Sequence, residues 1–177
     1  MRLRRNVDSV TPSLELLHGW LTRAPDAVHP SDAAVVLTQR AAELRDHPGE
    51  ISFPGGSWEL GDASPVATAL REAVEEVGLG AVGVTPVVLL PRLFIRASGF
   101  DVTGVVGYWR EPGPLAPVDA VETRRVLTVP LQELAQPERW REYATAGWRG
   151  PSFVLDDDAL LWGYTAEVLA FIGRHLR

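Results

Sequence analysis

The chain has 177 residues, of which 46% are hydrophobic, and it carries a net charge of −6. These values suit one folded domain over residues 1–177, and the acidic balance argues against a dedicated nucleic-acid binder, which needs a basic surface. The chain lacks cysteine, which excludes disulfides, thiolate catalysis and zinc sites with cysteine ligands. Because no apolar run is long enough to span a membrane and the start lacks a signal-peptide pattern, we expect a soluble cytoplasmic protein without a membrane partner.

Helical and strand patterns alternate along the chain. Leucines at helical spacing predict an amphipathic helix after Pro12. Short runs rich in β-branched residues predict strands at residues 33–37, 51–53, 87–95, 102–109, 125–129 and 153–155. Further helices are expected at residues 65–77 and 165–176. Helices at the start, middle and end, with strands between them, predict an α/β fold, an α/β/α sandwich with a mixed sheet.

The helix at residues 65–77 has clear local signals at both ends. Ser64 suits the N-cap, Pro65 suits the first helical position, and Gly78 suits the C-cap. Apolar residues recur at helical spacing and predict a face packed on the core. They are Val66, Leu70, Ala73, Val74 and Val77.

The opposite face of this helix carries three carboxylates. Glu72, Glu75 and Glu76 fall within roughly a 100° arc and repel one another unless a positive charge lies among them. Mg²⁺ favours such oxygen ligands, and Arg71 on the adjacent flank would tie down a carboxylate or orient a neighbouring loop. The plain alternative is a solvated acidic face. A metal site is favoured because the helix dipole disfavours negative charge near the C-terminal end, and because a glycine-rich turn precedes the helix.

Residues 56–79 resemble the Nudix box, in which a glycine and a glutamate precede the sequence Arg-Glu-aliphatic-x-Glu-Glu-x-Gly-aliphatic. Residues 71–79, REAVEEVGL, match its second half closely. The first half departs twice, because the segment from Gly56 to Arg71 is one residue longer and because Asp62 replaces the glutamate. Asp62 would then act as a helix-flanking cap or as a peripheral metal contact. The resemblance implies the Nudix fold with its catalytic loop-helix-loop.

Two further segments are similar to coenzyme A pyrophosphatases of this family. They are residues 37–56, which include LTQR and LRDHPGEISFPGG, and residues 162–166, WGYTA. Glu50 stands where glutamine is expected, and Ser57 where lysine is common. The resemblance implies hydrolysis of coenzyme A, or a derivative, to 3′,5′-ADP and 4′-phosphopantetheine. A homodimer is expected only by analogy with the family.

The resemblance also implies roles for the residues that match the Nudix box. Glu75 and Glu76 would be the main ligands of Mg²⁺ or Mn²⁺, with Glu72 as a further ligand and Arg71 beside them in the catalytic site. The cation would neutralise the diphosphate and assist the attack of water. The general base stays open between these carboxylates and two loop candidates. The loop candidates are Asp119 and Glu122, for which a solvated loop is the alternative.

Basic and glycine residues supply the substrate-binding candidates. Arg40 and Arg45 suit phosphate binding, although a surface role is equally compatible with either residue. Gly55 and Gly56 would bring backbone N–H groups near a phosphate. Trp58 could stack on adenine or simply cover the loop, and His47 is expected to form a structural hydrogen bond. Arg92 and Arg96 are candidates for lining the cleft.

Two other functions fit the same sequence. A Nudix hydrolase of a different diphosphate, such as a nucleotide sugar, a dinucleotide or a damaged nucleoside triphosphate, would keep the same box, because specificity lies in loops. A Nudix-fold domain that binds a nucleotide without cutting it would be free to lose the ligands. Retention of Arg71, Glu72, Glu75 and Glu76 favours an enzyme.

Overall fold

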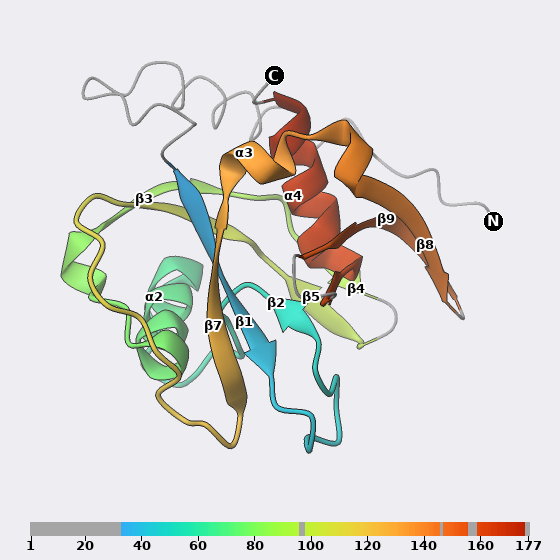
Figure 1. Ribbon diagram of the computed structural model, residues 1–177. Coiled ribbons are helices and arrows are strands. Elements are labelled where there is room, and N and C mark those ends of the chain that lie inside the picture. The colour runs from blue at the N-terminus through green and yellow to red at the C-terminus, as the bar shows by residue number, and fades with distance from the viewer. Residues whose placement is uncertain (1–32, 96–97, 146, 156–158, 176–177) are drawn as a thin grey trace.

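A computed structural model describes residues 33–95, 98–145, 147–155 and 159–175 (Figure 1). Its strands are β1 (Ala34–Arg40), β2 (Ile51–Ser52), β3 (Val84–Leu89), β4 (Leu93–Ile95), β5 (Phe100–Val102), β6 (Val105–Trp109), β7 (Thr123–Pro130), β8 (Trp140–Thr145), β9 (Trp148–Val154) and β10 (Leu160–Leu161). Its α-helices are α2 (Pro65–Val77), α3 (Leu131–Leu134) and α4 (Gly163–His175). Two short 3₁₀ helices are η3 (Ala81–Gly83) and η4 (Pro137–Arg139).

The strands form four small ladders, in the orders β2-β1-β7, β10-β9-β8, β3-β6 and β4-β5. The longest joins β1 to β7, from Ala34 opposite Pro130 to Arg40 opposite Thr123, with an irregularity at the Arg40 end. Every pairing among these described strands is antiparallel. The α/β class is therefore confirmed, while the expected mixed sheet takes the form of separate antiparallel ladders in this part of the chain.

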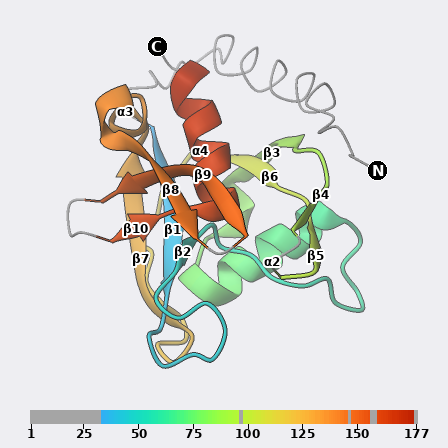
Figure 2. The ribbon, with the colours of Figure 1, turned by 90° about the vertical axis from the view of Figure 1, so that its right-hand side faces the viewer.

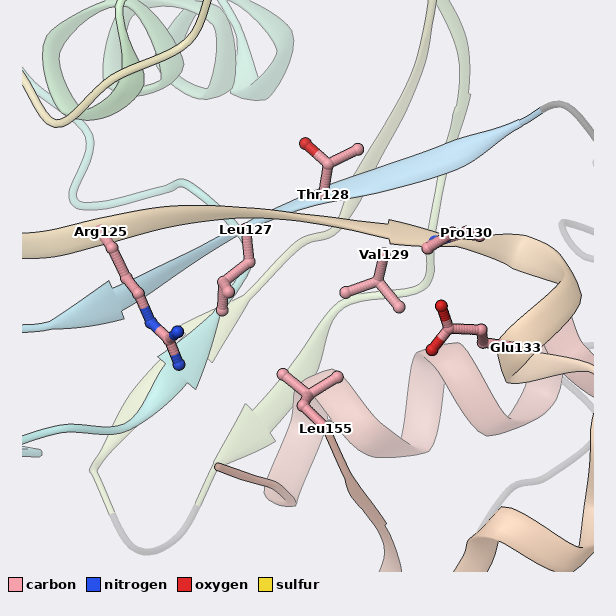
Figure 3. A pocket seen from close by; sticks show the side chains of 7 residues that line it. All are labelled: Arg125, Leu127, Thr128, Val129, Pro130, Glu133 and Leu155. Carbon is pink, nitrogen blue, oxygen red and sulfur yellow. The ribbon is translucent and has the colours of Figure 1, made fainter. Parts of the chain in front are cut away.

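Two helices enclose the central ladder. Figure 1 and Figure 3 show β1 and β7 between α2 on one side and α4 on the other. The second three-stranded sheet contacts α4 through β9 (Figure 2). A continuous apolar core fills the space between α4 and the strands, because each contributes buried side chains to it. Its fully buried members are Leu37, Leu134, Phe153, Leu161, Ala166 and Leu169.

The two long strands expected between residues 87 and 109 are each interrupted. The first is divided into β3 and β4, because Pro91 has no N–H to donate to a ladder. The second is divided into β5 and β6 at Gly104, where a side chain would not fit. A Cβ atom there would lie 2.7 Å from the Tyr164 hydroxyl and 2.9 Å from the Leu90 side chain.

Other expected boundaries differ less. The last helix begins at Gly163, two residues before the expected start, and β1 extends three residues beyond its expected end. The sequence did not predict α3, β8 or β10, because α3 and β10 are very short and β8 has the adjacent charges Arg141 and Glu142. Strand β9 begins five residues before its expected start. The helix expected after Pro12 lies outside the described residues. None of the described helices is long and apolar enough to cross a bilayer.

Candidate active site

The carboxylate-bearing helix α2 forms with the bounds that its sequence predicts. The Ser64 hydroxyl accepts a hydrogen bond from the Ala67 N–H at 3.2 Å, and Pro65 begins the first turn. Gly78 ends the helix in a left-handed conformation, with φ of 68°. Val77 is fully buried and Val74 is 42% exposed, so only part of the predicted apolar face packs on the core.

Glu76 lies against the glycine-rich loop that follows β2. The Gly55 N–H donates a hydrogen bond to Glu76 Oε2 at 3.1 Å. Burial raises the pKa of Glu76 to about 7. The Gly55 N–H and Arg40 oppose this rise, and the nearby Glu122 and Glu72 carboxylates add to it.

Glu72 lies against the next glycine of the same loop. A Cβ atom on Gly56 would lie 2.4 Å from Glu72 Oε1, so only glycine allows this approach. The Glu72 side chain is 15% exposed, and burial raises its pKa although Arg71 Nη1, 3.1 Å from Oε1, opposes the shift. Gly55 and Gly56 thus contact two different carboxylates of α2, one through an N–H and one through close packing.

Arg71 connects the helix to the loop before it. Its Nε and Nη2 donate to the two oxygens of Asp62 at 3.3 and 3.1 Å, and Nη2 also donates to the Ser57 carbonyl at 2.9 Å. Arg71 Nη1 donates to Glu75 Oε2 at 2.8 Å. Asp62 also accepts a hydrogen bond from the Thr68 hydroxyl at 3.0 Å. Arg71 therefore both ties down a carboxylate and orients the loop.

Asp62 is held by contacts with its own loop and with α2. Its side chain is 9% exposed, and both oxygens already accept hydrogen bonds. The Arg71 guanidinium lowers the pKa of Asp62 to about 2. Asp62 thus acts as a clamp that joins the extended loop to α2.

The two loop carboxylates before β7 lie in different environments. Arg40 Nη1 lies 3.5 Å from Glu122 Oε1, and the Glu122 carbonyl accepts a hydrogen bond from the Ala41 N–H at 2.8 Å. Asp119 instead accepts a hydrogen bond from the Val121 N–H through Oδ1 at 2.8 Å, which fixes a turn. Glu122 is therefore close enough to Glu76 to raise the pKa of that residue, whereas the Asp119 side chain is engaged in its own turn.

Arg40 is the better placed of the two arginines predicted to bind phosphate. Its Nε is buried and has no hydrogen-bond partner among the described residues, so this N–H is unsatisfied in the ligand-free protein. Arg45 is exposed in the loop between β1 and β2. Among the described residues, no hydrogen bond or ion pair connects Arg45 with the carboxylates.

The remaining polar candidates make local contacts. His47 Nδ1 lies 2.9 Å from Glu50 Oε2, and Trp58 Nε1 donates to the Asp62 carbonyl at 2.9 Å, so each side chain braces its own loop. Arg92 pairs with Asp101 across the β4–β5 ladder. Arg96 lies outside the described residues.

The donor set fits a hard divalent cation. Glu72, Glu75 and Glu76 offer only carboxylate oxygens, as Mg²⁺ and Mn²⁺ prefer, and Glu122 and Glu72 lie near enough to Glu76 to raise its pKa beyond the effect of burial. Among the described residues, no three acidic or histidine side chains already form a metal-binding group. Glu72 and Glu75 would have to turn away from Arg71 to join Glu76 around an ion.

Sequence reasoning missed one steric feature of this site, the contact between Gly56 and Glu72. We expect Gly56→Ala to lower hydrolytic activity by about tenfold, because displacing Glu72 by even an ångström degrades its alignment. The free energy of unfolding should change little, because the displaced group is the flexible end of a side chain. Steady-state kinetics and chemical denaturation measure the two effects.

Gly55→Ala is the matched control for this variant. A Cβ atom on Gly55 would have no neighbour within 4 Å, and alanine retains the N–H that contacts Glu76. Equal losses of activity in both variants would contradict the steric role of Gly56.

The raised pKa of Glu76 predicts pH-dependent stability in the metal-free protein. A carboxyl with a raised pKa holds its proton more tightly when folded, so its stabilisation is present below about 4.5, its ordinary value, and is lost as the pH rises through about 7. We expect a loss of about 1–2 kcal/mol over this range, after allowance for solvent screening. Urea unfolding in a chelator at several pH values measures the loss.

The Glu76→Gln variant provides the control, because glutamine does not titrate. Its free energy of unfolding should exceed that of the wild type at pH 8 and should approach it at pH 4. Parallel pH profiles for the two proteins would contradict the assignment of this charge to Glu76.

Comparisons with known proteins identify relatives of this chain. The NUDIX domain model matches residues 21–148. The uncharacterized Nudix hydrolase NudL of Pectobacterium atrosepticum is 33% identical over 89% of this chain and 84% of its own length. A NudL of Salmonella paratyphi B is 35% identical over 76% of this chain and 71% of its own length. Nudix hydrolase 15, mitochondrial, of Arabidopsis thaliana is 32% identical over 78% of this chain, which spans about half of that relative (51%).

The structure combines an α/β fold, a glycine-rich loop and a capped helix that carries a carboxylate face. The family match covers most of the chain, and the chain belongs to the Nudix family. It is thus a hydrolase of the class that acts on nucleoside diphosphate derivatives, and enzymes of this class generally use a divalent metal ion.

Proposed function

We propose that this Nudix hydrolase cleaves the diphosphate of coenzyme A, or of a coenzyme A derivative, to 3′,5′-ADP and 4′-phosphopantetheine. The observation that carries the proposal is the convergence of Glu72 and Glu76 on Gly56 and Gly55, with Arg40 at the edge of the same cluster. Carboxylates that could hold a divalent cation and an arginine that could contact a diphosphate thus lie in one cluster.

Glu72, Glu75 and Glu76 are the proposed ligands of Mg²⁺ or Mn²⁺. A bound divalent cation supplies charge neutralisation for the diphosphate and its leaving oxygen. Arg71 would release Glu72 and Glu75 to the cation. It would keep its hydrogen bonds to Asp62 and Ser57, which hold the loop in place. The ion pair to Glu75 is exposed, with 55% of that side chain accessible, so its exchange costs little.

Glu122 is the proposed general base. Its side chain is 52% exposed, so water can reach it, and the other three carboxylates are assigned to the cation. Glu122 would accept a proton as water attacks one phosphorus, while the bond from that phosphorus to the bridging oxygen breaks. Its carboxylate lies 3.5 Å from Arg40 Nη1 and close enough to Glu76 to raise the pKa of that residue.

The substrate assignment rests on the segments that flank the site. Arg40, whose buried Nε is unsatisfied, is the proposed contact for a diphosphate oxygen. Arg45, exposed in the preceding loop, is the proposed reader of the 3′-phosphate that distinguishes coenzyme A. The similarity of residues 37–56 and 162–166 to coenzyme A pyrophosphatases supports this choice over other diphosphates.

The test is product identification after incubation of the purified protein with coenzyme A and Mg²⁺ or Mn²⁺. Formation of 3′,5′-ADP and 4′-phosphopantetheine is the expected result. Turnover only of nucleotide sugars, dinucleotides or nucleoside triphosphates would replace the substrate, and a folded protein inactive on all of them would instead be a binding domain. Light scattering of the same sample tests the homodimer expected by analogy.

Arg45→Ala tests the second part of the substrate assignment. We expect this variant to raise KM for coenzyme A by about tenfold, because a charge-assisted phosphate contact is lost, and to leave the dephosphorylated form unaffected. Equal changes for the two substrates would show that Arg45 does not read the 3′-phosphate.

A further inference from the structure

Gln39, near the end of β1, makes side-chain hydrogen bonds to two separate parts of the structure. Its Oε1 accepts a hydrogen bond from Arg125 Nε of β7 at 2.6 Å, and its Nε2 donates to the Gly49 carbonyl at 3.1 Å. The backbone agrees with these contacts, because Gln39 is paired with Arg125 in β7 and with Ile51 in β2. The Gln39 amide therefore links β7 to the loop between β1 and β2, residues 41–50.

The two partners dictate which kind of side chain satisfies position 39. A guanidinium N–H only donates and a peptide carbonyl only accepts, so the side chain between them must offer one acceptor and one donor. A carboxamide offers both groups. A carboxylate would keep the contact with Arg125, but it would turn an oxygen toward the Gly49 oxygen with no proton between them. Glutamine therefore satisfies both partners at once, with one orientation of its amide.

The end of the loop that Gln39 holds is a tight turn. The Glu50 N–H donates to the His47 carbonyl at 3.3 Å, and His47 Nδ1 lies 2.9 Å from Glu50 Oε2. His47 and Gly49 both have positive φ, of 56° and 70°. A residue other than glycine keeps such a φ only where its surroundings hold it. The turn is thus closed by its own contacts, and the hydrogen bond from Gln39 to Gly49 sets its position relative to β7.

The loop has a second attachment at its start. Ala41 is buried, and its N–H donates to the Glu122 carbonyl at 2.8 Å. Arg45 lies between this attachment and the turn, two residues before His47, and it is exposed. Because the backbone is held on both sides of Arg45, the loop determines where this guanidinium can reach. Loss of the attachment at Gly49 would leave the turn anchored by the neighbouring strand pairing and would widen the range of positions open to Arg45.

We infer that Gln39 is a positioning residue for substrate binding, which fixes the loop that presents Arg45 to the 3′-phosphate. The inference rests on the proposed function, in which Arg45 reads that phosphate. Figure 3 shows the Arg125 side chain on the side of β7 that faces α4, away from α2, so the Gln39 amide bound to it lies away from the reacting atoms. A change at Gln39 should therefore weaken the binding of substrates that carry the 3′-phosphate and leave the chemical step unchanged.

The test uses Gln39→Glu, which keeps the acceptor for Arg125 and removes the donor to Gly49. We expect KM for coenzyme A to rise about fivefold, while kcat and the KM for the dephosphorylated form stay within about twofold of wild type. In an Arg45→Ala background the same change should have no further effect, because residues that act through one contact are not additive. Gln132→Glu is the matched control. It makes the same chemical change at an exposed position of α3 and should leave every value unchanged.

Hydrogen exchange measures the position of the loop without catalysis. The amides of residues 44–50 should exchange about fivefold faster in Gln39→Glu than in the wild type, because the loop opens more often once its attachment is lost. Exchange in this loop should be unchanged in Gln132→Glu. If Gln39→Glu does not fold, Gln39→Met replaces it with a side chain of similar length that lacks the amide, and the same results are expected.

Three results would overturn the inference. They are an unchanged KM for coenzyme A in the folded variant, equal increases in KM for coenzyme A and its dephosphorylated form, and a fall in kcat at constant KM. If the wild type does not hydrolyse coenzyme A, the proposed function fails, and the role assigned at the 3′-phosphate fails with it. Hydrogen exchange then decides separately whether Gln39 holds the loop, because faster exchange in the variant supports this attachment and unchanged exchange refutes it.

Discussion

Replacing Glu76 with glutamine is expected to lower metal-dependent hydrolysis by about a thousandfold. Glu76 combines a buried carboxylate, a hydrogen bond from the Gly55 N–H and two neighbouring carboxylates. Its removal would weaken cation binding and with it several kcal/mol of charge stabilisation, and each 1.36 kcal/mol changes the rate tenfold. Initial rates at saturating Mg²⁺ and Mn²⁺, together with the affinity for Mn²⁺, measure the effect.

The control for this prediction is Glu138→Gln, in the exposed 3₁₀ helix η4 and outside the carboxylate cluster. It should retain wild-type rates and Mn²⁺ affinity. We expect Glu76→Gln to remain folded and, without metal, to be more stable than the wild type at alkaline pH. A loss of activity in this variant would therefore not result from unfolding. Near wild-type turnover in Glu76→Gln and in Glu75→Gln would refute the proposed metal ligands.

The second large effect is expected at Gly173, where α4 crosses α3. A Cβ atom there would lie 2.1 Å from the Leu134 carbonyl oxygen, and the clash is with backbone that cannot rotate away. We expect Gly173→Ala to lower the free energy of unfolding by about 3 kcal/mol, although alanine favours the helix itself. For a domain of this size the thermal midpoint should fall by roughly 10 °C.

Gly80→Ala separates this steric effect from the general effect of replacing glycine. Gly80 has a φ of −72°, and a Cβ atom there would meet nothing within 4 Å. This variant should be as stable as the wild type, or slightly more stable, because alanine reduces the freedom of the unfolded chain. A Gly173→Ala protein with an unchanged thermal midpoint would mean that the two helices separate at little cost.

The sequence determined the elements whose causes are local. Helix α2 begins and ends where Ser64, Pro65 and Gly78 predict, because capping contacts join residues two to five positions apart. Its acidic face follows from helical spacing alone. The family, and with it the class of reaction, was also readable from the sequence, because the box places its residues on one loop and one helix.

Where distant packing competes with local preference, the sequence predicts less. Gly104 packs closely against Tyr164, sixty residues later, and nothing in the run of β-branched residues around Gly104 indicates this contact. Strand β8 has the adjacent charges Arg141 and Glu142 between two aromatic residues, and β9 pairs with it along its length. Such strands are decided by the partner rather than by their own composition.

Only the tertiary structure decided which of the predicted site residues meet. It brings Glu122 and Arg40 together across 82 positions of sequence, and it engages the Asp119 side chain in a turn of its own loop. It also decides that Asp62 clamps Arg71 and that Glu72 and Glu76 rest on adjacent glycines. Spacing rules extend over about one helical turn, whereas these contacts arise when the core closes and fixes loops from separate elements against one helix.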